Sequence, residues 1–415
     1  MIRDRQRSGI GMKRLNHNCY VFILAVIFIV LGYNQQYIKS LTDAVKGFEN
    51  GIKYDFTGSF ITLKDNIEDI SDKQVRYHDK LLDLNSVKEN LLGTRVIIKP
   101  DTTVVKAESG SLIIPSYPQK ADEIAKVAGR IAQLNEFAEE NGARFLYCAA
   151  PVKAMYEKEP ANVLNASSDN MDTFLAVLTE EGIPYIDFRE TFEKSHTDTK
   201  DIFYYTDHHW TVRSGLLATQ SICEKLNSLY GFKYDKKYTD IQNYKVTLLE
   251  NWFLGSYGKK VGRFFSWKGA DDFEVIVPDF ETNMTEERPY INEFRIGPFE
   301  NTVMFPERLD KNYYGQNTYS VYSGGDSHLQ IMRNNMNQDG KKILLIRDSF
   351  SCVVAPFLSL QTKELSVCDM READFVEGIR IDLKDYIIKT KPDYVIVLYN
   401  GVGSVNDAGK YDFLN

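Results

Sequence analysis

The chain has 415 residues, of which 43% are hydrophobic and 26% are charged, and its formal net charge is −8 at pH 7. These proportions exclude a disordered, collagen-like or disulfide-stapled chain and leave room for one large or two ordinary domains. A mean hydropathy of −0.34 excludes a multipass transporter, and the acidic balance argues against non-specific nucleic-acid binding, which depends on clustered Lys and Arg.

An uncharged apolar run near the N-terminus departs from this average. Residues 19–33 read CYVFILAVIFIVLGY, and the residues before them include Arg3, Arg5, Arg7, Lys13 and Arg14. A basic flank before an apolar run is typical of a signal sequence or signal anchor whose positive side stays in the cytoplasm. A buried core helix is the alternative, but the run is not amphipathic. We predict that residues 1–35 form a basic tail and an uncleaved single-pass anchor, with the rest of the chain outside the cytoplasmic membrane.

The segments after the anchor differ in composition. Residues 36–93 are rich in Lys, Asp and Leu with few Pro or Gly, which predicts a helical stalk. Residues 94–415 are predicted to form the main domain, and its first part has short β-branched runs separated by turns. The cysteines of this domain lie in or beside apolar runs without zinc-ligand spacing, so we expect no metal, no cofactor and no essential disulfide.

Helix and strand patterns then alternate along the main domain. Apolar residues recur at helical spacing in residues 121–142, 171–182 and 211–230, and continuous apolar runs such as RFLYCAA, KKILLI and DYVIVLY predict buried strands. Residues 231–339 are aromatic-rich and turn-rich, and we interpret them as a β-rich insertion. Buried strands that alternate with helices are typical of a parallel sheet covered on both faces, so the predicted fold class is α/β.

Two polar clusters lie at the ends of these elements. Residues 206–210 read TDHHW directly before a helix, and Ser349 directly follows a buried strand in IRDSF. In an open parallel sheet, ligands bind beyond the carboxyl ends of the strands, where the N–H groups of a following helix favour an oxyanion. A Ser hydroxyl needs a base such as imidazole, and that base needs a carboxylate. Asp207, His209 and Ser349 are therefore a candidate nucleophilic triad.

Simpler interpretations of these residues stay open. Asp207 could be no more than a cap of the following helix, and the His pair could be solvated or bind a metal, although no further ligands stand at fixed spacing. Residues 324–328 read GGDSH and contain a second Asp-Ser block, but they follow tyrosine-rich sequence with turn composition. We rank Ser327 below Ser349 as a nucleophile and keep His328 as a candidate substrate-site residue.

Several blocks of the sequence together resemble one family. They are YYTDHHWT (204–211), FLGSYGKKVG (253–262), LLIRDSFSCVVAPFL (344–358), CDMR (368–371) and DYVIVLYN (393–400), with Pro151 and Lys153 in a loop after a strand. From about residue 113 to residue 401, the chain closely resembles the DHHW family. That family is similar to the SGNH-like acetyltransferase domains of alginate O-acetylation proteins.

The resemblance implies a fold, a set of roles and partners. Residues 94–415 would be an SGNH-hydrolase-like catalytic domain in which Asp207 orients His209, His209 is the base, and Ser349 is the nucleophile and transient acetyl carrier. Proteins of this kind work outside the membrane beside a multipass O-acyltransferase that supplies acetyl groups. The acceptor would be a hydroxyl of an envelope or secreted polysaccharide.

The oxyanion donors are less well defined. The Gly of the Gly-Asp-Ser block is Arg347 here, so its small size is not available. The backbone N–H of Ser349 is the main candidate donor. Weak candidates for oxyanion or substrate contacts are Ser256, Gly258, Asn400, His208 and His328.

Three functions are compatible with the sequence. The leading one is an anchored polysaccharide O-acetyltransferase outside the cytoplasm. An extracellular carbohydrate acetylesterase would use the same triad with water as the acceptor. A catalytically silent polysaccharide-binding assembly protein is favoured by the 13% aromatic content and the tyrosine-rich insertion, because aromatic rings stack on sugars.

Overall fold

The computed structural model describes residues 35–51, 62–63, 66, 77–371, 381–401 and 411–414. The chain forms two compact units, residues 1–85 and 86–415. The apolar run predicted to be the anchor, residues 19–33, lies outside the described residues. Among the residues that are described, no helix combines the length and the apolar character needed to cross a membrane.

Helical segments are found among the described residues of the region predicted to be a stalk. Helix α2 spans Gln35–Gly51 and helix α4 spans His78–Leu91. The turn after α4 contains Gly93, which has a φ of 71° that glycine adopts without strain. The chain then enters a three-stranded antiparallel sheet made of β1 (Val96–Ile98), β2 (Thr103–Lys106) and β3 (Leu112–Ile113).

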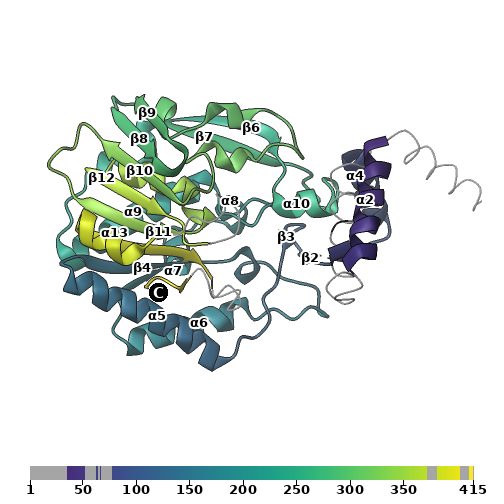
Figure 1. Ribbon diagram of the computed structural model, residues 1–415, viewed down its shortest axis with the longest axis horizontal. Coiled ribbons are helices and arrows are strands. Elements are labelled where there is room, and N and C mark those ends of the chain that lie inside the picture. The colour runs from purple at the N-terminus through teal and green to yellow at the C-terminus, as the bar shows by residue number, and fades with distance from the viewer. Residues whose placement is uncertain are drawn as a thin grey trace, which may run out of the picture. The chain divides into compact units, whose positions relative to one another are not determined.

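An eight-stranded sheet forms the centre of the second unit (Figure 1). Its order is β5 (Tyr185–Asp187), β4 (Arg144–Ala150), β13 (Tyr394–Asn400), β11 (Lys342–Arg347), β12 (Glu364–Cys368), β10 (Leu329–Asn334), β8 (Met284–Arg288) and β9 (Glu293–Gly297). The first five strands are parallel, and each remaining neighbour pairs in the antiparallel sense. The sheet is therefore mixed.

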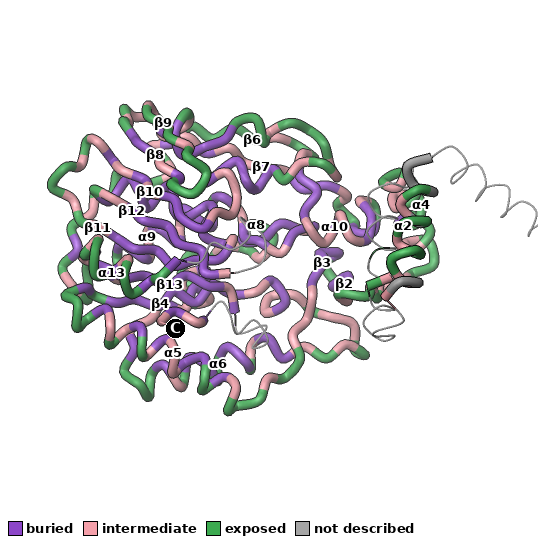
Figure 2. The backbone as a smooth tube through the Cα atoms, in the orientation of Figure 1, coloured by how far each residue is buried: buried purple, intermediate pink, exposed green. Residues whose placement is uncertain are grey.

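Helices cover both faces of the parallel strands because those strands are apolar on both sides. Leu344 and Ile346 of β11 pack with α5 (Ala121–Glu140), α6 (Ser167–Glu180) and α13 (Leu383–Thr390). Ile343 and Leu345, which point the other way, pack with α9 (Val212–Tyr230) and α12 (Ala355–Ser359). Figure 2 shows the central strands as a continuous buried layer. The predicted α/β class with helices on both faces is confirmed.

The predicted parallel sheet is mixed in the structure, because part of the predicted β-rich insertion joins it. Strands β8, β9 and β10 all lie within residues 231–339 and extend the sheet from the open edge of β12, where Leu329 pairs with Cys368. Strands β8 and β9 form a hairpin whose turn includes Asn292 at a φ of 53°. The hairpin accounts for the antiparallel pairing of β8 with β9. Strand β10 joins β11 through residues 335–341, which are too few for the crossover that a parallel arrangement needs.

The rest of residues 231–339 forms a separate two-stranded sheet. Strand β6 (Tyr244–Phe253) pairs with β7 (Asp271–Pro278), and helix α10 (Ser256–Val261) lies between them in the sequence. Residue Asp271 at the start of β7 is buried. Further short α-helices among the described residues are α7 (Phe188–Lys194), α8 (Thr199–Ile202) and α11 (Phe299–Thr302).

Candidate active site

Ser349 lies at the carboxyl end of β11, on the turn that enters the short 3-10 helix η7 (Ser349–Val353). The carboxylate of Asp348 fixes this turn. Its Oδ1 accepts the Phe350 N–H at 3.0 Å, and its Oδ2 accepts the Asn400 N–H at 2.7 Å from the end of the neighbouring strand β13. The position of Ser349 is therefore set by two adjacent parallel strands.

The segment between α8 and α9 brings a histidine to this serine. The Nε2 atom of His209 lies 2.8 Å from Ser349 Oγ, although the two residues are 140 positions apart. The Nδ1 atom of His209 lies 2.5 Å from Asp207 Oδ1. The structure thus brings together the three residues that the sequence singled out, in the order carboxylate, imidazole, hydroxyl.

Asp207 is buried and held by several donors. Its Oδ1 also accepts the backbone N–H of His209 at 2.9 Å, and its Oδ2 accepts the backbone N–H of Ser256 at 2.6 Å. Burial acts to raise the pKa of Asp207, but His209, His208 and the Ser256 N–H outweigh it and hold that pKa well below its usual range. Asp207 is therefore a carboxylate at neutral pH.

A glycine allows this close approach between α10 and Asp207. A Cβ atom placed on Gly255 would lie 2.2 Å from the Cβ of Asp207. Gly255 directly precedes α10, so its lack of a side chain lets the Ser256 N–H reach the carboxylate. The block FLGSYG is thus a support for Asp207.

Aromatic side chains surround His209. The ring of Tyr319 stacks on the imidazole with centroids 4.1 Å apart and an interplanar angle of 14°. The ring of Phe350 lies 5.2 Å away on a tilted plane. The indole of Trp210, which is completely buried, donates to the Phe350 carbonyl at 2.8 Å. These contacts fix the plane of the imidazole relative to Ser349.

His208 contacts both Ser256 and the ring of His209. Its Nδ1 lies 2.8 Å from Ser256 Oγ, and its ring centroid lies 3.6 Å from that of His209. Burial, together with the neighbouring His209, lowers the pKa of His208 to about 3. Its imidazole is therefore neutral at physiological pH.

Asp207, His208 and His209 also form a geometric group that a metal ion could occupy, with their donor atoms within 4.8 Å of one another. The donor atoms have other partners. Both ring nitrogens of His209 face hydrogen-bonding atoms, and both carboxylate oxygens of Asp207 accept N–H groups. A metal would have to break these contacts, so the donor set fits a proton-transfer chain better than a cation site.

The structure assigns different surroundings to the weak candidates. The N–H of Ser256 binds Asp207, and the N–H of Gly258 donates to the Thr206 carbonyl at 2.8 Å. Both amides therefore hold the Asp207 segment rather than point toward a substrate. Asn400 binds the Asp348 carboxylate through its backbone. His328 is buried, and its ring lies edge-on to Tyr290 with centroids 6.3 Å apart.

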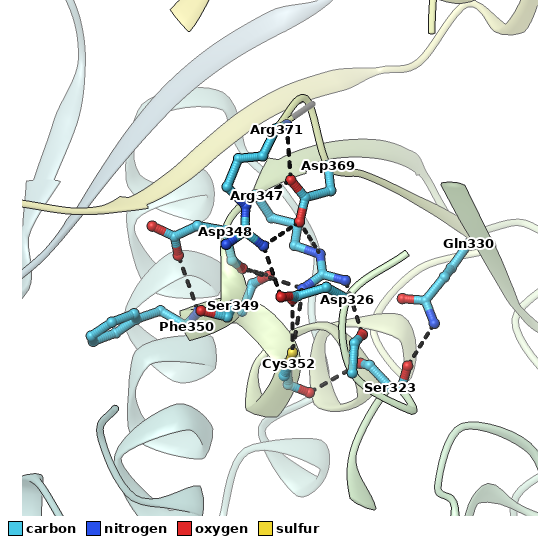
Figure 3. A network of polar contacts seen from close by, with 12 residues as sticks. Ser323, Asp326, Gln330, Arg347, Asp348, Ser349, Phe350, Cys352, Asp369 and Arg371 are labelled. Atoms are coloured by element: carbon cyan, nitrogen blue, oxygen red, sulfur yellow. Dashed lines mark hydrogen bonds and ion pairs between the residues drawn. The ribbon is translucent and has the colours of Figure 1, made fainter. Parts of the chain in front are cut away.

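A four-charge network flanks Ser349 (Figure 3). The completely buried Arg347 places its Nη1 2.5 Å from Asp326 Oδ1 and its Nε 3.9 Å from Asp369 Oδ2. Arg371 binds Asp369 through Nε and Nη2 and reaches Asp326 Oδ2 at 3.0 Å. Two guanidinium groups and two carboxylates thus neutralise one another at the carboxyl ends of the central strands β11 and β12.

This network explains both unusual serine blocks. Arg347 replaces a small residue because its side chain serves the network, not the oxyanion. Asp326 of the GGDSH block is its partner, whereas Ser327 Oγ contacts the nearby Leu329 carbonyl at 3.4 Å. This role was not predicted from the sequence, although an Arg before one Asp-Ser block and an Asp in another were a signal that the two could pair.

Comparisons with known proteins agree with the predicted resemblance. Residues 114–247 match the family model for the SGNH hydrolase-like domain of the acetyltransferase AlgX. Bacillus cereus PatB1, solved with a sulfonyl adduct, is similar with a TM-score of 0.60 and 20% identity, covering 75% of this chain and 100% of that chain. A DHHW family protein from Eubacterium siraeum has a TM-score of 0.57 and 20% identity, covering 77% and 97%.

No curated protein sequence matches the chain at a significant level. The family match and the DHHW structure confirm the resemblance to the DHHW and AlgX-type SGNH-like proteins. At 20% identity the structural similarities concern the fold. Residues 114–247 contain Asp207 and His209, while Ser349 lies beyond them.

Proposed function

We propose that the chain is an O-acetyltransferase that moves an acetyl group through Ser349 onto a hydroxyl of an envelope or secreted polysaccharide. One observation carries this proposal, namely the continuous contact from Ser349 Oγ through His209 to the Asp207 carboxylate. The match of residues 114–247 to an acetyltransferase domain supports acyl transfer as the reaction class.

The first half of the proposed reaction acylates the serine. His209 Nε2 takes the proton from Ser349 Oγ as the oxygen attacks the acetyl carbonyl of the donor, which forms a C–O bond and a tetrahedral oxyanion. Asp207 stabilises the resulting imidazolium and holds its Nδ1–H. Collapse of the oxyanion breaks the bond to the donor oxygen, and His209 returns the proton to that leaving group.

The second half transfers the acetyl group to the acceptor. A sugar hydroxyl replaces the donor, and His209 removes its proton as it attacks the acetyl-serine ester. The new ester bond forms on the sugar while the bond to Ser349 Oγ breaks, and the proton returns to the serine. The backbone N–H of Ser349 is the proposed oxyanion donor in both halves.

The proposed setting follows from the N-terminal sequence. A single-pass anchor at residues 19–33 would place the second unit outside the cytoplasmic membrane. The proposed acetyl donor is a multipass membrane O-acyltransferase, and the proposed acceptor is a polysaccharide. Neither step requires a metal or a cofactor in this scheme.

The test uses the full-length chain in detergent with a chromogenic acetyl ester. Ser349→Ala and Asp207→Asn should each lower kcat by roughly 10⁴-fold, as removal of triad members does in other enzymes. A sulfonyl fluoride should label Ser349 in the wild type, because activated serine hydroxyls attack such reagents, and His209→Ala should abolish the labelling. Unchanged acetyl release in Ser349→Ala would refute the proposal.

An oligosaccharide acceptor distinguishes transfer from hydrolysis. Faster ester turnover with the acceptor, together with acetylated sugar in the mass spectrum, would support the transferase. Equal turnover with acetate as the product would instead indicate an acetylesterase, which uses the same residues with water. Binding of polysaccharide without any acetyl release would indicate the catalytically silent assembly protein.

A further inference from the structure

The backbone of residues 204–207, just before His209, is held by buried groups of opposite charge. Lys153, which lies in the 3-10 helix η1 (Lys153–Met155) after β4, is buried with only 2% of its surface exposed. Its Nζ donates to the carbonyls of Tyr204 at 2.8 Å, Tyr205 at 3.0 Å and Asp207 at 2.6 Å. An ammonium group has three N–H donors, so these three acceptors use all of them.

A carboxylate binds the amides of the same segment. Asp271, at the start of β7, accepts the N–H of Tyr205 through Oδ1 at 2.6 Å and the N–H of Thr206 through Oδ2 at 2.8 Å. The Thr206 hydroxyl also donates to Asp271 Oδ2 at 2.5 Å. Asp271 is 3% exposed. In residues 204–207, Lys153 thus binds backbone carbonyls and Asp271 binds backbone N–H groups.

These two residues come from separate parts of the fold, and both bind the segment of residues 204–207. Lys153 follows a central strand of the large sheet, whereas Asp271 belongs to the two-stranded sheet of β6 and β7. Among the described residues, the hydrogen bonds of Lys153 and Asp271 go to residues 204–207 and not to Ser349 or the ring of His209. Their effect on the site therefore acts through the backbone that carries Asp207.

We propose that Lys153 and Asp271 form a two-sided clamp that positions Asp207 and His209 for the reaction at Ser349. This inference rests on the proposed function, because it assigns two positioning residues to that reaction. The acceptors of Lys153 include the carbonyl of Asp207 itself, so loss of the clamp would move the carboxylate. Since misplacement by about 1 Å can cost roughly 10²-fold in rate, the clamp should control kcat.

The protonation state of Lys153 gives the clamp a pH dependence. Burial lowers the pKa of Lys153 to about 8, although Asp271, Asp207 and Glu157 act in the opposite direction. The ring of Tyr257 also faces the ammonium, with Nζ 5.4 Å from its centroid. A neutral amine has two N–H donors and one lone pair, so deprotonation leaves one of the three carbonyls facing a lone pair. Activity should therefore fall above about pH 8.

The contribution of Lys153 to stability should not fall in the same range. The pKa of Lys153 is lower in the folded state than its ordinary value of 10.5, so between about pH 8 and 10.5 the unfolded chain binds more protons at this site. The contribution of Lys153 to the free energy of unfolding therefore rises with pH there. Loss of activity without loss of stability separates a positioning role from a structural one.

The experiment uses two clamp variants and two matched controls in the full-length chain. Lys153→Met and Asp271→Asn should each lower kcat/KM for an acetyl ester by about 10²-fold, mainly through kcat. The double variant should lose less than the product of the single losses, because both changes free the same segment. Lys106→Met and Glu286→Gln alter a buried lysine and a buried carboxylate elsewhere and should keep wild-type kcat/KM.

A second measurement reports on the site without catalysis. In protein labelled with ¹⁵N only at its six histidines, the short Asp207–His209 contact should give a low-field proton resonance. That resonance should shift or disappear in Lys153→Met and Asp271→Asn but stay in both controls. The resonance tests the clamp even if the wild type releases no acetyl group, a result that would refute the proposed function but not the clamp.

The clamp is overturned if both variants keep the wild-type kcat/KM and the low-field resonance. It is also overturned if the controls lose as much activity as the clamp variants for the same loss in Tm. If Lys153→Met does not fold, the pH dependence of kcat/KM of the wild type tests the clamp instead. In that protein, kcat/KM that stays constant while the Lys153 side chain loses its proton would contradict the clamp.

Discussion

The indole N–H of Trp210 donates to the carbonyl of Phe350 at 2.8 Å, so the residue after His209 holds the residue after Ser349. Both residues are buried. This bond is a second connection between the two segments, and it does not involve the atoms of the His209–Ser349 contact. The Trp of the DHHW block is therefore a structural part of the site.

Trp210→Phe should test this tie. The change removes a buried donor and leaves the Phe350 carbonyl with the weaker contact from the Tyr319 hydroxyl at 3.3 Å. A lost buried hydrogen bond costs about 1–3 kcal/mol, and we expect a lower Tm together with about a tenfold loss in kcat/KM. Trp252→Phe is the control, because Trp252 Nε1 donates to the Leu309 carbonyl at 2.7 Å away from the site. Equal kinetic losses in the two variants would contradict the tie.

Gly255→Ala should impair the site through Asp207. The new Cβ would lie 2.2 Å from the Asp207 Cβ, so either α10 or the carboxylate must move. We expect kcat/KM for an acetyl ester to fall by about 10²-fold. Gly129→Ala in α5 meets no atom within 4 Å and should raise stability by about 0.5–1 kcal/mol with unchanged kinetics. Full activity in Gly255→Ala would show that the approach is not needed.

His208 should make stability depend on acid pH. Its folded-state pKa of about 3 lies below the ordinary value of 6.5, so the unfolded chain binds more protons between these values. The contribution of His208 is complete above about pH 6.5 and is lost as the pH falls toward 3. The stability of the wild type relative to His208→Gln, measured as the difference between their urea midpoints, should therefore fall as the pH is lowered from about 6.5 to 4. Parallel curves would argue against an imidazole that is held neutral in the folded chain.

Arg347→Met should destabilise the fold strongly. The change removes a buried cation from two acidic neighbours, Asp326 and Asp369, and breaking a buried pair in this way costs about 3–5 kcal/mol. Arg333→Met is the control, because Arg333 pairs with Glu287 and Glu364 while 35% exposed, and exposed pairs contribute about 0–1 kcal/mol. Free energies of unfolding in urea measure both. Similar values for the two variants would show that the network does not support the fold.

The sequence was sufficient to predict the central strands and to single out Asp207, His209 and Ser349, which the structure brings together, but not the residues that hold them in place. Ser349 and His209 were recognisable because each follows or precedes a regular element with a clear pattern. Lys153 and Asp271 contact backbone atoms, and a backbone acceptor leaves no residue type to match in a sequence. The antiparallel addition of β10 to β12 was equally hidden, because the choice of a distant pairing partner is not written in local periodicity.

The contact between His209 and Ser349 is expected to form late in folding. The two residues are separated by 140 positions that include β6, β7, β8, β9 and β10, and Asp271, which holds the histidine segment, lies among them. Contacts of such long range form after local ones, because loop closure must come first. Reactivity of Ser349 toward a sulfonyl fluoride would therefore report the final stage of maturation, when the whole second unit has assembled.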